Sequence, residues 1–337
     1  MRNLLKQLCL IDGPSGSEKP VTDFIMKELE GYAELKRDSM GNVIAFKKGK
    51  QRAKRRLMID AHADEVGMII TFITSDGFLK FSTLGGILPS VLLGRKVKIE
   101  GKVNGVIGVK PVHLCSAEEK ETLPKAKDLY IDIGADSREE AESMVNIGDS
   151  ATFISDFCEF GENVVKAKAI DDRGGCAVLL SLLKNDSEYD YYATFSVQEE
   201  NGCRGARVAA YTVNPEFSIC LESTTAADIS GVSDDKKVCI LGKGPAISFM
   251  DNSTLYDKEL YNAAINSGLT CQSKTAIAGG NNSGAIHLSR EGVRPMVISI
   301  PCRYIHSSSC ACDIRDAEAS IKLCQYMINK ICSGEMG

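Results

Sequence analysis

Hydrophobic and polar residues alternate along this chain in short blocks that predict a mixture of helices and strands. Residues 4–10 have the spacing of a short helix, and a second helix follows through Phe24, Ile25 and Leu29. Three strands are predicted next, at residues 42–47, 57–61 and 66–73. The last two are short apolar runs of the kind that form buried strands. Helices that precede and separate such strands predict an α/β domain.

The pattern changes between about residues 74 and 160, where short β-rich runs such as 97–99 and 105–109 are separated by glycine and proline turns. The α/β pattern then returns. Its elements are predicted at 172–183 (helix), 192–197 (strand), 205–211 (helix), 217–221 (strand) and 294–300 (strand). We therefore expect a small β domain, residues 74–162, inserted into a discontinuous domain made of residues 1–73 and 163–337.

Composition narrows the possible functions. The chain has 337 residues, of which 44% are hydrophobic and 25% charged, so it can bury a sizeable core as one large or two ordinary domains. The net charge of −5 does not indicate nucleic-acid binding, and no apolar stretch approaches the roughly 20 residues that span a bilayer. The N-terminal apolar segment is too short for a signal peptide, so we expect a cytoplasmic protein.

The 13 cysteines are typical of small core residues in a reducing compartment, because their number is odd and no Cys-x-x-Cys pair occurs. Cys310 and Cys312 lie near His306 in the sequence and could be soft metal ligands. Two thiols one residue apart are poorly spaced for a tetrahedral zinc site, however, so we disfavour that interpretation.

Metal-capable side chains recur where the predicted strands end. They are His62 and Asp64, Glu199 and Glu200, Glu222, and His306, with Asp171 and Asp172 just before a predicted helix. In an open α/β sheet the carboxyl ends of the strands line the ligand crevice, so residues distant in sequence can converge there. The other two histidines, His113 and His287, lack such neighbours and are given no functional role.

Each of these residues also has an interpretation without a metal. His62 could be a core imidazole, Glu199 and Glu200 could form a solvated turn, and Asp171 could begin a helix. Two histidines with several carboxylates nevertheless form a nitrogen and oxygen donor set that suits zinc, cobalt or manganese. The set is large enough for two ions, which need a bridging carboxylate and a nearby base.

At these residues the chain resembles the M42 family of metallo-aminopeptidases, the group of glutamyl and tetrahedral aminopeptidases. The resemblance extends over nearly the whole length. The matching segments are residues 13–16, 62–67, 84–86, 105–108, 130–134, 169–173, 197–200, 242–245 and 301–307.

The resemblance implies a mixed-sheet zinc-peptidase domain with helices on both faces and an inserted PDZ-like dimerisation domain. It implies an aminopeptidase that removes N-terminal residues from short peptides. It also implies two divalent metal ions per subunit, either zinc or cobalt, with manganese as a further candidate. The partners that it implies are other copies of the chain, as dimers that assemble into tetrahedral dodecamers.

The resemblance also implies roles for individual residues. The metal ligands that it implies are His62, Asp171, Glu200, Glu222 and His306. Asp171 would bridge two ions, with His62 and Glu222 completing one shell and Glu200 and His306 the other, or with the same residues paired differently. Glu199 would be the general base, and Asp64 would orient His62.

Four parts of the chain depart from the family pattern. Glu222 stands where many members have aspartate, and residues 279–282 read Gly-Gly-Asn-Asn in place of Gly-Gly-Thr-Asp. Ser308 and Cys310 replace the proline and glutamate that usually follow His-Ser, and residues 84–90 lack expected polar groups. Substrate specificity is therefore not carried over from the family.

Two other functions are considered. Some members of this group have been labelled endoglucanases, and paired carboxylates are what a glycosidase needs. A glycosidase has no need of His62, His306 and Asp171, however, and the chain has no tryptophan to stack sugars. The other alternative is a relative that keeps the fold for assembly but has lost turnover. Retention of both Glu199 and Glu200 argues against it.

Overall fold

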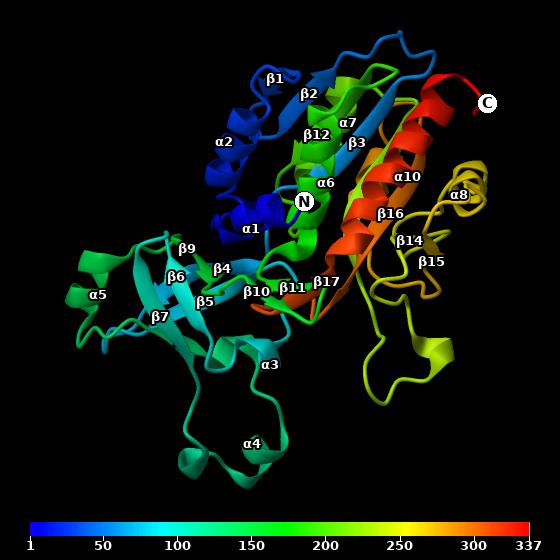
Figure 1. Ribbon diagram of the computed structural model, residues 1–337. Helices are drawn as coiled ribbons and strands as arrows, with labels where there is room; N and C mark the ends of the chain where they lie inside the picture. Colours follow the sequence, from blue (N-terminus) through cyan, green and yellow to red (C-terminus); the bar gives the residue numbers. More distant parts are fainter. Residues whose placement is uncertain (337) are drawn as a thin grey trace.

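The large sheet dominates the computed structural model, which describes residues 1–336 (Figure 1). Within these residues the sheet has 11 strands. Along its main path they are β1 (Glu34–Arg37), β2 (Val43–Lys47), β12 (Tyr191–Ser196), β3 (Leu57–His62), β13 (Phe217–Thr225), β16 (Arg294–Arg303), β17 (Cys310–Asp313), β11 (Val164–Ala167) and β10 (Cys158–Phe160). Two short strands, β14 (Ala246–Ile247) and β15 (Gln272–Ser273), are added beside β16.

Four parallel strands, β12, β3, β13 and β16, form the centre of this sheet. The strands on both sides of them are antiparallel to their neighbours. In the register of the central strands, Ser196 of β12 lies opposite His62 of β3. The carboxyl ends of all four strands therefore reach the same edge of the sheet, as expected for a ligand-binding α/β fold.

Helices cover both faces of the sheet, because successive strand residues point to opposite sides. In β3, Leu57 and Ile59 belong to the core on the face of α6, whereas Met58 packs in the core that contains Ala206 of α7. The helices whose buried residues join the first core include α1 (Arg2–Leu10), α2 (Lys19–Glu28), α6 (Ile170–Lys184), α8 (Lys258–Ile265) and α10 (Ile314–Cys332). Those in the second are α7 (Arg204–Val213) and α9 (Ser283–Ile286).

A closed six-stranded barrel lies beside the sheet and has its own hydrophobic core (Figure 1). Around the barrel the strands are β4 (Gly67–Ile73), β5 (Leu79–Leu84), β8 (Tyr130–Asp132), β7 (Val103–Gly108), β6 (Lys96–Ile99) and β9 (Ser150–Phe153). The helices of this region are α3 (Pro89–Leu92), α4 (Ala117–Glu121) and α5 (Arg138–Met144). In this region 3-10 turns cover Val112–Leu114 and Ala126–Asp128. A further 3-10 turn, Asp234–Lys236, follows β13 of the large sheet.

The barrel differs in its limits from the insertion expected at residues 74–162. It already includes β4, which was assigned to the first part of the larger domain, and β10 after it belongs to the large sheet. An apolar run alone does not show which sheet a strand joins, because that depends on its pairing partners. A second correction concerns Glu222, which lies inside β13 because this strand continues to Thr225.

The remaining strands and helices that the sequence pattern predicted are present, with ends shifted by a few residues. The longest helix, α10, was not predicted. None of the helices in residues 1–336 combines the length and apolar character needed to cross a membrane.

Candidate metal centre

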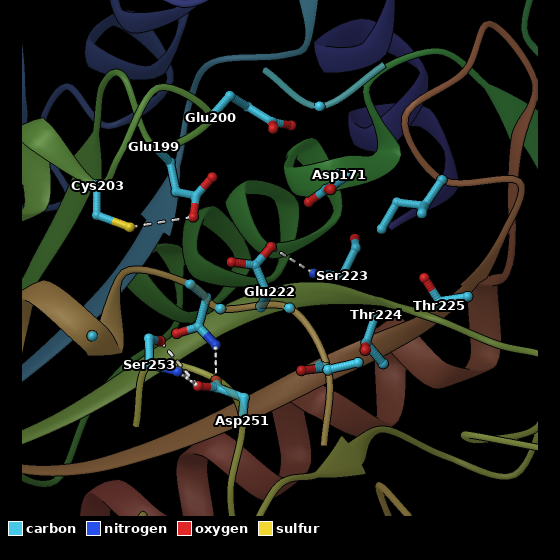
Figure 2. A pocket seen from close by; sticks show the side chains of 18 of the residues that line it. Asp171, Glu199, Glu200, Cys203, Glu222, Ser223, Thr224, Thr225, Asp251 and Ser253 are labelled. Carbon is cyan, nitrogen blue, oxygen red and sulfur yellow. Dashed lines mark hydrogen bonds between the residues drawn. The ribbon is translucent and has the colours of Figure 1, made fainter. Parts of the chain in front are cut away.

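The predicted metal ligands and the predicted base lie together at the carboxyl edge of the four central strands. They are His62 at the end of β3, Glu199 and Glu200 after β12, Glu222 in β13, His306 after β16 and Asp171 near the start of α6. Figure 2 shows the four acidic residues, Asp171, Glu199, Glu200 and Glu222, arranged around the same space. The parallel strands therefore collect residues that are up to 244 positions apart, from His62 to His306.

Asp171 lies between the two histidines, with one carboxylate oxygen directed to each. Its Oδ1 is 3.3 Å from His62 Nε2, and its Oδ2 is 3.1 Å from His306 Nε2. Glu222 Oε1 is 3.5 Å from His62 Nε2, and Glu200 Oε1 is 3.4 Å from His306 Nε2. This geometry corresponds to two neighbouring donor groups that share Asp171.

Both histidines present the same ring nitrogen to the carboxylates. His62 Nδ1 is 3.2 Å from the backbone oxygen of Asp64, and His306 Nδ1 is 2.9 Å from the backbone oxygen of Gly86. A backbone oxygen can only accept, so Nδ1 carries the proton and donates in each case. Burial acts to lower the pKa of both rings, but the carboxylates around Nε2 outweigh it and raise the pKa of His62 and that of His306, the latter to about 10. The carboxylates therefore favour a positive charge at each Nε2, and a metal ion in place of that proton uses the same donors, so the donor set fits a metal ion.

Two carboxylate oxygens in this cluster support the same conclusion. Asp171 Oδ1 and Glu200 Oε1 are buried and accept no hydrogen bond from residues 1–336. Buried carboxylate oxygens without a donor are costly unless a cation binds them. Ligand atoms of His62, Asp171 and Glu200 lie close enough to hold one ion, and so do those of His62, Asp172 and Glu222. Asp172 is thus a further candidate ligand, which the sequence pattern marked only as the neighbour of Asp171.

The electrostatic environment is strongly acidic and buried. Burial raises the pKa values of Glu200 and Glu222, and the nearby Asp171 carboxylate raises them further. Burial also acts to raise the pKa of Asp171, but contacts with His306 and His62 outweigh it and lower that pKa. The cluster therefore gathers more negative groups than its two histidines can balance.

Asp64 is completely buried next to His62 and has the contacts of an orienting residue. Its Oδ1 is 3.3 Å from His62 Nδ1 and accepts a hydrogen bond from the backbone N–H of Glu199 at 3.0 Å. Its Oδ2 accepts hydrogen bonds from the hydroxyl of Ser15 and the backbone N–H of Glu200. Burial acts to raise the pKa of Asp64, but these partners lower it, so the carboxylate is ionised.

Glu199 stands apart from the two donor groups. Its Oε2 is 4.0 Å from His62 Nε2, farther than any of the other carboxylate contacts of the two histidines. Its Oε1 accepts a weak hydrogen bond from the thiol of Cys203 at 3.5 Å (Figure 2). Burial, together with Asp64 and Asp171, raises the pKa of Glu199 to about 7. The side chain is 12% exposed and lines the pocket, so it can reach a bound molecule.

An open pocket with a volume of about 590 Å³ leads to this cluster. Asp171, Glu199, Glu200, Glu222 and His306 form one part of its wall. Asn281 and other residues of the segment 278–285 form another part of the wall. A pocket of this size can hold the end of a peptide-sized molecule.

The segment that departs from the family pattern is held in place by its asparagines. The side-chain amide of Asn282 donates to Asp60 at 2.7 Å and to Ser196 at 2.8 Å. The amide of Asn281 donates to Tyr256 at 2.8 Å and to Asp251 at 3.2 Å. Both residues are buried, so their contacts fix this wall of the pocket.

The other residues considered from the sequence lie outside the donor groups. His113 is exposed in a 3-10 turn, and His287 contacts the backbone oxygen of Ser283. Cys312 lies opposite Cys302 on the paired strands β17 and β16, and both are buried. Cys310 lines a small cavity beside Asp171, Glu200 and His306 but is not among the grouped ligands.

Comparisons with known proteins agree on one family. Residues 41–323 match the family model described as M42 glutamyl aminopeptidase. The chain is 33% identical over 340 residues to the lysyl aminopeptidase of Pyrococcus furiosus, an alignment that covers 97% of this chain and 96% of the relative.

Solved structures with the same fold are also known. An aminopeptidase from the archaeon Desulfurococcus kamchatkensis superposes with a TM-score of 0.93 at 33% identity, covering 98% of this chain and 95% of the other. The TET1 peptidase of Pyrococcus horikoshii, described as assembling into a tetrahedron or a large octahedral shell, has a TM-score of 0.85 at 32% identity. That match covers 96% of this chain and 98% of the other.

Proposed function

The chain belongs to the M42 peptidase family and is a hydrolase of the aminopeptidase class. We propose that it removes N-terminal residues from short peptides, with two divalent metal ions and with Glu199 as the general base. The observation that carries the proposal is the position of Asp171, whose two oxygens face His62 and His306 separately. A carboxylate shared in this way is what a dinuclear site requires.

We assign the first ion to His62, Asp171 and Glu222, and the second to His306, Asp171 and Glu200. Zinc or cobalt suits this mixture of imidazole and carboxylate donors, and manganese is compatible with it. When bound, two such ions supply Lewis acidity and make a water molecule more acidic. Asp64 keeps the His62 ring in the orientation that exposes Nε2, and the backbone of Gly86 does the same for His306.

Glu199 is the residue free to move protons. It is the carboxylate farthest from the histidines, and it faces the pocket in which the first peptide bond would lie. In the proposed reaction it accepts a proton from the attacking water and later donates one to the leaving amine. Because the hydrogen bond from Cys203 is weak, the Glu199 carboxylate is free to take up and release this proton.

The first test replaces Glu199 with glutamine, which keeps the shape of the side chain but removes the base. We expect aminopeptidase activity to fall by about 10²- to 10⁴-fold while metal content stays near two ions per chain. Activity is measured on a panel of aminoacyl substrates and metal by elemental analysis, with Glu318→Gln as an exposed control. Activity near the wild-type level would show that the base is another group.

The second test replaces Asp171 with asparagine. Because both donor groups share this carboxylate, we expect metal content to fall below one ion per chain, together with the loss of activity. Full metal occupancy in this variant would disprove the bridging role, and it would leave the assignment of Glu199 to its own test.

Aminopeptidase activity is distinguished from the endoglucanase alternative by the product. We expect a chelator to abolish the release of amino acids from peptides, with no release of reducing sugar from glucans. The two histidine contacts with Asp171 favour the peptidase, because a glycosidase needs only its two carboxylates. A protein that binds two metals yet turns over neither substrate class would support the assembly-only alternative.

We also propose that the protein forms large homo-oligomers, with the barrel as a PDZ-like dimerisation domain. The support is the assembly described for the TET1 peptidase and the apolar surface of the excursion around α4. There Val112, Leu114 and Leu123 have 71%, 60% and 70% of their surface exposed. Exposed apolar side chains gathered in one excursion of the chain favour a protein contact. A cytoplasmic location is part of the same proposal, because all 13 cysteines are free.

A further inference from the structure

A dense basic segment joins β2 to β3, although the chain as a whole is acidic. Residues 47–56 include seven lysines and arginines, whereas the net charge of the protein is −5. Together with nearby loops this segment lines a depression with a volume of about 710 Å³, which we call the basic depression. Its cationic lining residues are Lys48, Lys50, Arg52, Lys54, Arg55 and Arg56. Only two carboxylates, Asp190 and Glu216, line it as well.

The basic depression lies far from the candidate metal centre. It includes Leu57, the first residue of β3, whereas His62 at the other end of β3 belongs to the metal centre. Five residue steps along a strand span about 17 Å. Tyr191, the first residue of β12, also lines the depression. The two sites therefore occupy opposite ends of the same parallel strands.

The backbone of the basic segment is firmly held. The N–H of Lys50 donates to Ser187 at 3.1 Å, and that of Gln51 donates to Glu188 at 2.8 Å. Farther along, the N–H of Lys54 donates to Cys332 at 2.9 Å. A run of like charges tends to be disordered when nothing holds it, so this segment is ordered by its neighbours rather than by its own side chains.

Gly49 shows how closely the segment is packed. A Cβ atom at this position would lie 2.1 Å from the backbone carbon of Tyr189, so only glycine allows this approach. The backbone on either side of Gly49 is thus fixed, and it carries Lys48 and Lys50 at the rim of the depression.

The nearby carboxylates neutralise only part of these cations, because Glu216 pairs with Arg55 and Glu188 pairs with Lys50 at 3.8 Å. Glu216 accepts from the Arg55 side chain at 3.0 Å and from the backbone N–H of Arg56 at 2.9 Å. Asp190 accepts from the backbone N–H of Ala53. Lys48, Arg52 and Lys54 are exposed and form no ion pair within residues 1–336. The lining residues therefore carry an excess of four positive charges.

We propose that the basic depression binds a small polyphosphate anion, either inorganic triphosphate or the triphosphate group of a nucleotide. Clustered lysines and arginines repel one another, and an anion with several phosphates relieves this repulsion while accepting their hydrogen bonds. A triphosphate carries about four negative charges at pH 7, because the second pKa of its terminal phosphate is near 6. The volume suits a small molecule rather than a duplex nucleic acid.

The wall of the depression also allows the two sources of a triphosphate to be distinguished. Phe46 and Tyr192 line it, with ring centroids 5.0 Å apart and an angle of 50° between the rings. Both side chains are half-buried, so one ring face could stack against a nucleobase. A base contributes to binding only if the natural ligand is a nucleotide.

The test is a calorimetric titration of the full-length protein with inorganic triphosphate and, separately, with a nucleoside triphosphate. We expect one site per chain, weakened at least about tenfold in the triple variant Lys48→Glu, Arg52→Glu and Lys54→Glu. A matched variant, Lys36→Glu, Lys258→Glu and Lys322→Glu, has the same net charge and should bind within about twofold of wild type. A milder variant, Arg52→Gln with Lys54→Gln, repeats the test if the triple variant folds poorly.

The outcomes of these measurements decide the proposal. Loss of binding in the triple variant but not in the matched variant supports it, provided that aminopeptidase activity without the anion is unchanged. If Phe46→Ala weakens the binding of the nucleoside triphosphate but not that of inorganic triphosphate, the ligand is a nucleotide. If it weakens neither, the ligand is free polyphosphate. Binding that survives in the triple variant overturns the proposal, because the anion then binds elsewhere. Binding of single-stranded RNA without binding of triphosphate also overturns it.

Discussion

Arg173 connects the N-terminal segment to the metal centre, and its replacement tests how much of the fold depends on one buried cation. The side chain is fully buried in α6. Its Nη1 donates to the backbone oxygens of Leu8 at 2.6 Å and Ile11 at 3.0 Å. Its Nε donates to the backbone oxygen of Ala63 at 2.9 Å, between His62 and Asp64. The same guanidinium therefore fixes both the end of α1 and the strand end that carries His62, a proposed metal ligand.

We predict that Arg173→Met destabilises the protein by about 4 kcal/mol. Methionine has a similar length, so the main loss is hydrogen bonding rather than volume. Each bond from a charged donor contributes about 1.5–3 kcal/mol, and three such bonds are lost together with a weaker one to Gly13 at 3.4 Å. Relaxation reduces this sum, and removing one partner of a buried charged group usually costs about 3–5 kcal/mol.

Thermal unfolding measured by calorimetry at a fixed protein concentration gives the assay. A loss of about 4 kcal/mol corresponds to a decrease of about 6 °C in the melting temperature, because the unfolding entropy of a 337-residue chain is about 0.7 kcal/mol/K. Lys258→Met, at an exposed position, should melt close to wild type. Arg173→Lys keeps the charge but cannot reach all the oxygens, so it should fall between the two. If Arg173→Met melts within about 2 °C of wild type, the carbonyls have other donors and the reasoning is wrong.

Two further changes test other parts of the structure. Burial raises the pKa of Asp316 to about 6, although the backbone N–H groups of Gly242 and Gly244 act to lower it. Its protonated form is therefore favoured in the folded state, and about 3 kcal/mol of stability should be lost as the pH rises from 4 to above 6. Asp316→Asn should remove that part of the pH dependence of the melting temperature, and an unchanged slope would contradict it. Glu222→Asp should withdraw the carboxylate from His62 by about 1.5 Å. We expect a metal titration of this variant to show weaker binding of one of the two ions than in the wild type. Wild-type affinity for both ions would contradict the role of Glu222.

Much of the candidate site could be predicted because its residues obey one geometric rule. Parallel strands end at a common edge, so metal-capable side chains after buried apolar runs are expected to meet. His62, Glu200 and His306 follow this rule, although they come from β3, the loop after β12 and the loop after β16. The helix that begins near Asp171 was also expected, because an acidic pair precedes its apolar positions.

The groups that orient these residues could not be predicted in the same way. The contact of His306 with Gly86 uses a backbone oxygen from a segment 220 positions away. A backbone oxygen has no residue type, so no pattern in the sequence marks it. The hydrogen bond from Ser15 to Asp64 depends similarly on how the turn after α1 packs against β3. The limits of the barrel were missed for a related reason, because pairing decides which sheet a strand joins.

Glu222 and His62 lie at the same level on neighbouring strands, because β13 and β3 pair in a register that places Cys220 opposite Asp60. Residue 222 lies inside β13, three residues before the strand ends, whereas His62 is the last residue of β3. The last residues of β13 thus continue past the end of β3, and they do not set Glu222 deeper in the sheet than His62. Glu222 reaches 3.5 Å from His62 Nε2, and its Oε1 also accepts from the backbone N–H of Ser223 at 3.0 Å. The two side chains therefore meet from neighbouring strands, and this contact is the support for our proposal that they hold the same ion.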